Sequence, residues 1–155
     1  MNENSISFVV SGDPFGKERP RAARKGRILT TYTPKKTVNY EKRVRSCYLK
    51  EHEDKFLEGA VEADITAYHA IPKSASKKKK EKMNNNEIPC TVKPDADNIA
   101  KCILDPLNAL AFSDDNHVCK LVVEKKYSNE PRVEVELKEY VPWVSPIDVF
   151  ILQWV

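Results

Sequence analysis

The sequence predicts a single α+β domain with a small mixed β-sheet of about four strands flanked by helices. Its 155 residues, 41% hydrophobic and 32% charged, match the size of one ordinary domain and suffice to bury a core. Apolar residues alternate in some segments and recur every three or four residues in others, which distinguishes strands from helices. The resulting order is strand, helix, strand, helix, strand, strand, with no internal repeat, and it is typical of α+β domains.

The first half of the chain contains two predicted strands with one long helix between them. Residues 5–10 are rich in apolar side chains and run into Ser-Gly-Asp-Pro, a turn signal. Residues 35–56 carry apolar side chains at roughly helical spacing and are followed by Gly59, so we expect a helix there. Residues 61–69 alternate between apolar and polar side chains, which is typical of a half-buried strand.

The second half predicts two helices followed by two strands. Residues 72–86 are polar and rich in lysine, and they favour a short exposed helix in a mobile excursion. Residues 95–110 place apolar side chains at intervals of three and four beside a charged stripe, which predicts an amphipathic helix. Residues 118–127 and 133–137 predict two strands that form a hairpin across Ser-Asn-Glu-Pro.

The net charge of +3 conceals two strongly basic segments. Residues 17–50 hold twelve basic and two acidic side chains, a net charge of +10. Residues 73–82 hold six lysines and one glutamate, a net charge of +5, so the rest of the chain is strongly acidic. This distribution predicts a phosphate-binding surface beside carboxylates, with a polyanion as the ligand.

The segment from residue 17 to residue 27 is the stronger nucleic-acid signal. Arginine predominates there and Pro20 excludes a regular helix, so we expect an irregular loop whose guanidinium groups contact phosphates. The residues expected to contact DNA are Lys17, Arg19, Arg21, Arg24, Lys25, Arg27, Lys73 and Lys77. Lysines 77–80 are also compatible with a solvated face or a flexible loop. Tyr32 either stacks on a base or anchors the loop to the core, and an isolated tyrosine favours anchoring.

The densest group of carboxylates belongs to the amphipathic helix predicted over residues 95–110 and to the loop after it. Asp95 is predicted at the helix start, Asp97 in the first turn and Lys101 one turn later. If the following loop folds back, Asp114 and Asp115 approach the same helix start. Oxygen ligands of this kind suit Mg²⁺ or Mn²⁺. Crowding the carboxylates costs Coulomb repulsion unless a cation is present.

The same residues also have a purely structural interpretation. Asp95 can cap the helix, Asp97 and Lys101 can form a helical ion pair worth about 0.3 kcal/mol, and the aspartates at 114 and 115 can form a turn. The basic segments favour the catalytic interpretation, because a divalent ion beside cationic surfaces is what metal-assisted phosphodiester hydrolysis requires. His117 is expected to open the next strand rather than to bind Mg²⁺, which prefers oxygen.

A long acidic motif carries a family resemblance. The stretch Lys93-Pro-Asp-x-Asp-Asn-x-x-Lys-x-x-x-Asp-x-Leu-Asn108, followed by the two aspartates, resembles the signature of the RusA-type Holliday junction resolvases. These are small endonucleases often encoded by phages and prophages. Weaker similarities lie in Gly16-Lys-x-Arg-Pro-Arg21, Tyr32-Thr-Pro34 and Pro72-Lys-Ser74, and together the motifs cover most of residues 5–138.

The resemblance implies a homodimeric endodeoxyribonuclease that makes paired cuts in four-way DNA junctions during recombination and repair. It implies dependence on Mg²⁺, for which Mn²⁺ can substitute, and a RusA-like fold. By motif, Asp95, Asp97 and Asp115 are the expected metal ligands, and these three together with Lys101 are the expected catalytic residues. Asp114 has no role that separates it from its neighbour.

Two residues depart from the family pattern. Pro106 stands where the family usually has a small helix former, and a proline inside a helix costs about 3 kcal/mol, so we expect a kink or a break. Ala109 stands where the family usually has glycine. Both departures bear on the position of Asp105 and on the path of the chain to the two later aspartates.

Two other functions fit the same patterns: a Mg²⁺-dependent nuclease acting on flaps or other branched DNA, and a non-catalytic nucleic-acid-binding module. The endonuclease domain is expected to span residues 1–140. Residues 141–155 form an apolar tail, shorter than the roughly 20 residues of a membrane span, which we expect to pack on the core or on a second protomer.

The beginning of the chain and the cysteines predict the compartment. The N-terminus lacks the basic and apolar regions of a secretory signal, and the four cysteines are widely spaced with no Cys-x-x-Cys pair. We therefore expect a cytoplasmic protein, with no membrane association, whose cysteines are reduced residues of the core.

Overall fold

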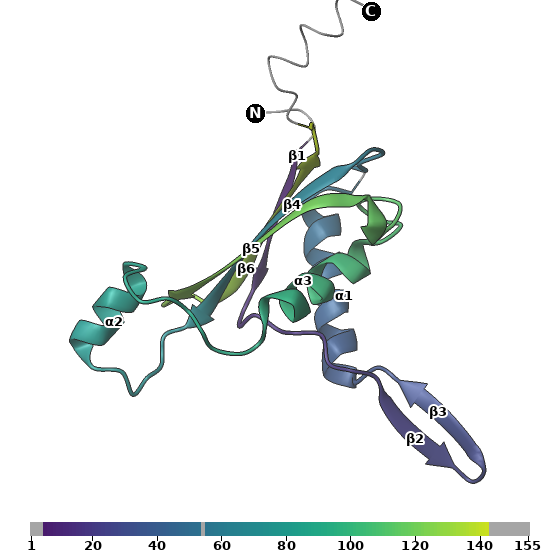
Figure 1. Cartoon of the computed structure of the whole chain (residues 1–155), viewed down its shortest axis with the longest axis horizontal. Coiled ribbons are helices and arrows are strands. Elements are labelled where there is room, and N and C mark those ends of the chain that lie inside the picture. Colours follow the sequence, from purple (N-terminus) through teal and green to yellow (C-terminus); the bar gives the residue numbers. More distant parts are fainter. Residues whose placement is uncertain (1–4, 54, 143–155) are drawn as a thin grey trace, which may run out of the picture.

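A computed structural model describes residues 5–53 and 55–142 and has the predicted α+β architecture (Figure 1). Its larger sheet has four strands in the order β1-β6-β4-β5, and a separate two-stranded sheet consists of β2 and β3. The elements are β1 (Ser5–Ser11), β2 (Arg21–Lys25), β3 (Ile28–Tyr32), α1 (Lys35–Glu51), β4 (Val61–Ala70), α2 (Lys77–Asn84), α3 (Ala96–Leu104), the 3₁₀ helices η1 (Asp105–Leu107) and η2 (Asp115–His117), β5 (Val118–Ser128) and β6 (Arg132–Glu139).

The pairing of the last two strands differs from the prediction. β5 and β6 do not form a hairpin, because β4 lies between them, parallel to β5 and antiparallel to β6. The four Cα steps from Ser128 to Arg132 reach about 13 Å, whereas two strand spacings need only about 9.6 Å. The short connection therefore spans one intervening strand as easily as it joins two neighbours. Its length alone could not decide the pairing.

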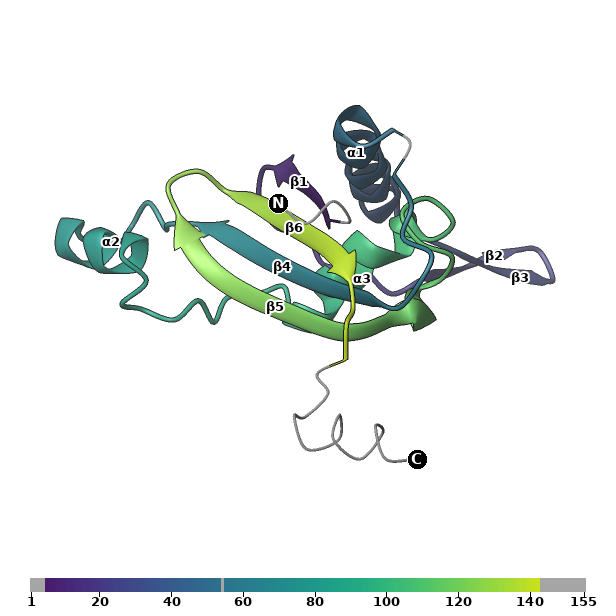
Figure 2. The same ribbon diagram turned by 90° about the horizontal axis from the view of Figure 1, so that it is seen from above.

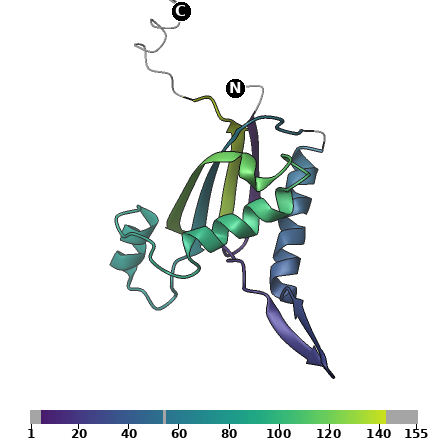
Figure 3. The same cartoon turned by 45° about the vertical axis from the view of Figure 1, so that its right-hand side comes forward.

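One face of the sheet forms the core. On β4 the side chains of Val61, Ala63, Ile65 and Ala67 are fully buried, and the intervening polar residues are half-buried, as the alternation predicted. α1 and α3 cover this face (Figure 3), and their buried side chains join the same apolar cluster. The four cysteines are free, as predicted. Cys102 alone is fully buried, and its burial raises the pKa of the thiol to about 12, whereas Cys119 is exposed, so the expectation of four core cysteines was wrong.

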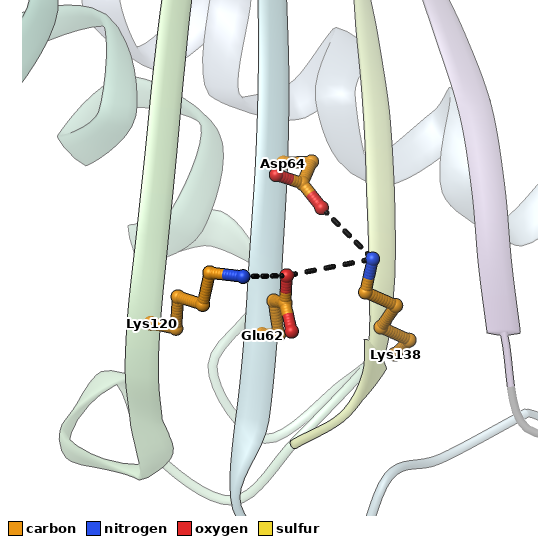
Figure 4. A network of polar contacts seen from close by, with 4 residues as sticks. All are labelled: Glu62, Asp64, Lys120 and Lys138. Atoms are coloured by element: carbon orange, nitrogen blue, oxygen red, sulfur yellow. Dashed lines mark hydrogen bonds and ion pairs between the residues drawn. The ribbon is translucent and has the colours of Figure 1, made fainter. Parts of the chain in front are cut away.

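Within the described part of the chain no helix covers the other face of the sheet, which we call the open face, and this face carries a network of ion pairs (Figure 4). The carboxylate of Glu62 lies 2.7 Å from Nζ of Lys120 and 3.5 Å from Nζ of Lys138, and the latter also lies 3.1 Å from Asp64. The hydrogen bond from Lys120 lowers the pKa of Glu62. Charges that alternate with buried apolar residues explain how one face of the sheet stays in water.

Both main helices end earlier than predicted. α1 ends at Glu51 because His52 leaves the helical region, and its Nε2 lies 2.7 Å from the carbonyl oxygen of Ser7. α3 ends at Leu104 and continues as the 3₁₀ helix η1, in which Pro106 lacks the N–H that an α-helix would need. The break expected at this proline is therefore confirmed.

The basic segment after β1 is not an irregular loop. It forms the antiparallel pair β2–β3, in which Arg21 faces Tyr32 and Lys25 faces Ile28. A two-residue turn joins the strands, and Gly26 adopts a φ of 64° that favours glycine there. We refer to residues 21–32 as the arm. The lysine-rich excursion contains the short helix α2, as predicted.

The two basic segments lie at opposite ends of the molecule. The arm and α2 project in different directions, with α3 between them, in each of the three ribbon views (Figure 2). None of the helices in the described ranges is both long and apolar enough to cross a membrane. Of the predicted tail, residues 143–155 lie outside the described part of the chain.

Candidate active site

The start of α3 positions the three motif residues on one helix. Asp95 is the N-cap residue, with an extended backbone, and its carbonyl oxygen accepts a hydrogen bond of 3.1 Å from the amide of Ile99. Its exposed carboxylate makes no capping hydrogen bond. Asp97 lies in the first turn, and Nζ of Lys101 lies 3.6 Å from its carboxylate. Both side chains are more than half exposed, so this exposed pair contributes little to stability.

A surface pocket of about 250 Å³ lies where α3 meets the start of β5. It combines three carboxylates and one ammonium group with an apolar floor. Its lining residues are Asp97, Ala100, Lys101, Leu104, Asp105, Asp115, Val118 and Leu121. Thus α3, η1 and η2 each contribute one aspartate, and residues far apart in the sequence converge. We call this the acidic pocket.

Lys17 connects the acidic pocket to the basic half of the chain. Its ammonium forms an ion pair with Asp105 and lies 3.1 Å from the carboxylate of Glu41 on α1. Its amide donates a 2.9 Å hydrogen bond to the carbonyl oxygen of Asn98. Partial burial opposes the charge, but the hydrogen bonds and charges of the two carboxylates outweigh it and raise the pKa of Lys17. Lys17 therefore neutralises one aspartate of the pocket.

Unlike Asp105, which is paired with a lysine, Asp115 lies beside other carboxylates. Asp114 caps η2, and its carboxylate accepts a hydrogen bond of 3.1 Å from the amide of Asn116. A side-chain hydrogen bond with Asp114, together with the negative charges of Asp114 and Asp105, raises the pKa of Asp115. The raised pKa shows that negative charge is crowded on this side of the pocket.

The donor chemistry of the acidic pocket fits a hard divalent cation. Its oxygen donors suit Mg²⁺ or Mn²⁺, and a cation would relieve the repulsion that raises the pKa of Asp115. Within residues 5–53 and 55–142, no three His, Cys, Asp or Glu side chains converge closely enough to form a complete metal site. The structure brings Asp97, Lys101 and Asp115 to one pocket, and it leaves Asp95 exposed at the helix start, outside the lining.

Seven of the eight residues expected to contact DNA fall at the two ends of the molecule, whereas Lys17 is half-buried and forms ion pairs with Asp105 and Glu41. Arg19, Arg21, Arg24 and Arg27 are exposed on or beside the arm, and Lys73 and Lys77 are exposed beside α2. The backbone of Lys25 belongs to β2, and its side chain lies outside the described part of the structure. Tyr32 is 49% exposed, so the expectation that it anchors this segment to the core was wrong. A residue of β3 that projects from an isolated ribbon has no core to reach.

Sequence reasoning missed Asp105 as a residue of the pocket and Glu41 as a partner of Lys17. Asp105 falls eight residues after Asp97 on the charged stripe of the predicted helix, and this spacing was the available signal. Glu41 carried no signal, because its contact with Lys17 joins α1 to a loop that is distant in the sequence. His117 is half-buried directly before β5, as expected for a polar residue that opens a strand.

Two comparisons with known proteins identify the family of the chain. A family model described as "Endodeoxyribonuclease RusA" matches residues 11–138, which include the arm, α3 and the acidic pocket. A relative named "Uncharacterized protein YqaN", from Bacillus subtilis (strain 168), is 38% identical over 136 residues, covering 86% of this chain and 96% of the relative. The protein is therefore an endodeoxyribonuclease, a hydrolase of DNA phosphodiester bonds. It belongs to the RusA family of Holliday junction resolvases, nucleases that depend in general on divalent metal ions.

Proposed function

We propose that this protein resolves four-way DNA junctions by paired, Mg²⁺-dependent phosphodiester cuts, as a cytoplasmic homodimer. The observation that carries the proposal is the acidic pocket, which Asp97, Asp105 and Asp115 line together with Lys101. Basic surfaces at both ends of the molecule support a polyanionic substrate. Family membership supports a branched DNA substrate.

We assign metal binding to the aspartates and stabilisation of the phosphate charge to Lys101. Asp97 and Asp115 would hold the cation, with Asp95, which lies outside the pocket lining, as the third ligand, and Mn²⁺ would substitute for Mg²⁺. When bound, such a cation polarises the scissile phosphate and lowers the pKa of a water molecule. Lys101 stabilises the negative charge that develops on the phosphate, and its contact with Asp97 directs the ammonium toward the pocket.

Lys17 and Asp105 have a positioning role. Their ion pair neutralises one carboxylate, so the pocket carries less negative charge toward an incoming phosphate. The basic side chains contact backbone phosphates, which read DNA shape rather than sequence. They are Arg19, Arg21, Arg24, Lys25 and Arg27 at one end and Lys73 and Lys77 at the other. A twofold dimer supplies one active site for each strand that is cut.

The test is cleavage of a labelled four-way junction with Mg²⁺, with EDTA, and by the Asp97→Asn variant. Asp97 is exposed and the substitution keeps its shape, so the variant should fold normally. We expect cleavage to require Mg²⁺ and to fall by about a hundredfold or more in the variant. Glu136→Gln, which removes an exposed carboxylate from the open face of the sheet, should cleave like the parent.

Parental activity in Asp97→Asn would contradict the role of the acidic pocket. A substrate panel that contains a flap, a nicked duplex and a linear duplex tests the junction preference separately. Equal cleavage of all four substrates would contradict junction resolution and leave the hydrolytic site in place.

A further inference from the structure

The arm lacks the support that normally stabilises two strands. Apart from each other, β2 and β3 pack extensively on no element of the described chain, and every described residue of both strands is exposed. The arm extends away from the rest of the molecule (Figures 1 and 3). A two-stranded ribbon alone is marginally stable in water, so a surface that covers the arm would stabilise it.

The arm carries two kinds of side chain that together suit DNA. Arg21, Arg24 and Arg27 give it a positive charge, and Nε of Arg24 donates a 3.1 Å hydrogen bond to the carbonyl oxygen of Gly26, which places this guanidinium at the tip. Ile28 and Leu29, also at the tip, are 67% and 70% exposed. The tip therefore offers both charged and apolar side chains to a partner.

The register distributes these side chains over both faces. Leu29 pairs with Arg24, and Ile28 pairs with Lys25, so the two apolar side chains point to opposite faces of the ribbon. Neither face is therefore purely polar. A ribbon of this kind fits a groove better than it fits a flat protein surface, because a groove covers both faces and lets the tip reach the floor, where the base edges lie.

The base of the arm is fixed relative to the acidic pocket. Four residues before β2, the amide of Lys17 is bound to the carbonyl oxygen of Asn98 on α3, and its ammonium is bound to Asp105. Gly16 lies so close to α3 that an added Cβ would come within 2.5 Å of Cβ of Pro94. A substrate held by the arm is therefore held at a set position from the pocket.

We propose that the arm inserts into the major groove of the DNA substrate, with its arginines on phosphates and with Ile28 and Leu29 against base edges. Charge complementarity selects DNA as the occupant, because the exposed arginines of the arm would repel the arm of a second copy. The major groove is about 12 Å wide and admits a two-stranded ribbon. This inference rests on the proposed function for the identity of its ligand.

The test compares an apolar variant with a charge variant of the arm. Ile28→Thr with Leu29→Thr keeps strand propensity and charge but removes the apolar tip. Arg24→Ala with Arg27→Ala removes charge. Binding to a fluorescent four-way junction and to a duplex of equal length is measured by anisotropy in EDTA, at several salt concentrations. Val9→Thr, on the open face of the sheet opposite Glu134, is the matched control.

We expect the apolar variant to bind about tenfold more weakly with an unchanged salt slope, because no charge is lost. The charge variant should bind more weakly with a slope reduced by about 2, since each lost phosphate contact removes about 0.9. Methylation of guanine N7, which lies in the major groove, should weaken binding of the parent and not of the apolar variant.

Parental affinity in the apolar variant would overturn the proposal, as would insensitivity of the parent to N7 methylation. A lower molecular mass in solution for the apolar variant than for the parent would also overturn the proposal, because it would mean that the tip of the arm packs on a second copy of the chain. Cleavage is not measured, so the result does not depend on nuclease activity. If the parent bound the junction and the duplex equally, the proposed specificity for junctions would be contradicted. The duplex affinities of the parent and the variants would still test the role of the arm.

Discussion

Two aspartates of the acidic pocket have opposite electrostatic surroundings. Asp105 is paired with Lys17, whereas Asp115 faces Asp114, which raises its pKa. A cation placed among them gains most from Asp115 and least from the aspartate that already has a partner. At the scale of single residues, the pocket therefore has a preferred side for a metal ion, close to η2 and Asp97.

Ala109 is a residue whose backbone favours another amino acid. Its φ of 57° lies in the left-handed region, which costs a residue with a Cβ about 1–2 kcal/mol, and its side chain is exposed. Ala109→Gly relieves this strain and loses at most about 1 kcal/mol to the greater freedom of the unfolded chain. We expect a gain of about 0.5–1 kcal/mol, seen as a melting temperature about 1–4 °C higher.

Ala111→Gly is the control for this prediction. Ala111 is fully buried in the same loop and has no positive φ, so the same exchange removes packing and adds freedom to the unfolded chain. Its melting temperature should fall. A lower melting temperature in Ala109→Gly as well would show that the left-handed backbone is not strained by alanine.

His69 should make stability depend on pH. It is 94% buried on β4, and its Nε2 has no hydrogen-bond partner among the described residues. Burial and the positive charge of Lys125 lower its pKa, and Asp13 only partly opposes them. The unfolded state therefore binds a proton first as the pH falls through about 6.5, and the folded state loses stability by at most about 1.4 kcal/mol per pH unit.

Thermal unfolding of the parent and of His69→Gln between pH 8 and pH 5 measures this effect. The glutamine does not titrate, so its melting temperature should fall less than that of the parent over the same range. Only the pH slopes are compared, because the substitution also changes packing. Equal slopes would assign the pH dependence to other groups.

At the scale of elements, the loop after β1 and the start of α3 form one packed unit. An alanine at position 16 would place its Cβ 2.5 Å from Cβ of Pro94 and 3.2 Å from Cβ of Asn98. We expect Gly16→Ala to cost about 1–3 kcal/mol. It should also lower junction cleavage, because the displaced loop carries Lys17 away from Asp105.

Gly59→Ala is the matched control, since no atom lies within 4 Å of an added Cβ there and its φ is not positive. This variant should be as stable as the parent or slightly more so. Denaturant unfolding and junction cleavage of Gly16→Ala and Gly59→Ala test whether the close approach of Gly16 to Pro94 matters for stability and activity. Equal behaviour of both would mean that the loop adjusts without cost.

The elements that could be predicted from the sequence are those whose own residues bury one face. The alternation in β4 and β6 and the apolar stripe of α3 identified them because side-chain periodicity and burial coincide. The pairing of β5 and the arm could not be predicted in this way. Strand neighbours depend on long-range packing, and the arm buries neither face.

The site residues, like the elements, were predictable only where one element fixes their spacing. The residues that share α3, Asp97 and Lys101, were predictable from helical spacing, because one helix fixes their separation. The ion pair of Lys17 with Asp105 was not, because it joins segments 88 residues apart. Local spacing predicts which groups share an element, and only the fold decides which elements meet.

At the scale of the whole molecule, the arm and α2 lie at opposite ends with α3, which lines the acidic pocket, between them. Under the proposed function, DNA that contacted both ends would pass the pocket once, and one protomer would cut one strand. Symmetric resolution then requires two protomers related by a twofold axis. We expect a mass in solution of about 35 kDa, twice the 17.7 kDa of one chain.

Paired cutting can be tested on a supercoiled plasmid that extrudes a cruciform. Two cuts made before dissociation give linear DNA, whereas a single cut releases the supercoiling, reabsorbs the cruciform and leaves a nicked circle. We expect the parent to give mainly linear product. Mixing it with an excess of Asp97→Asn should convert the product to nicked circles, because mixed dimers carry one active site. An unchanged ratio of linear to nicked product would show that the two cuts come from one protomer.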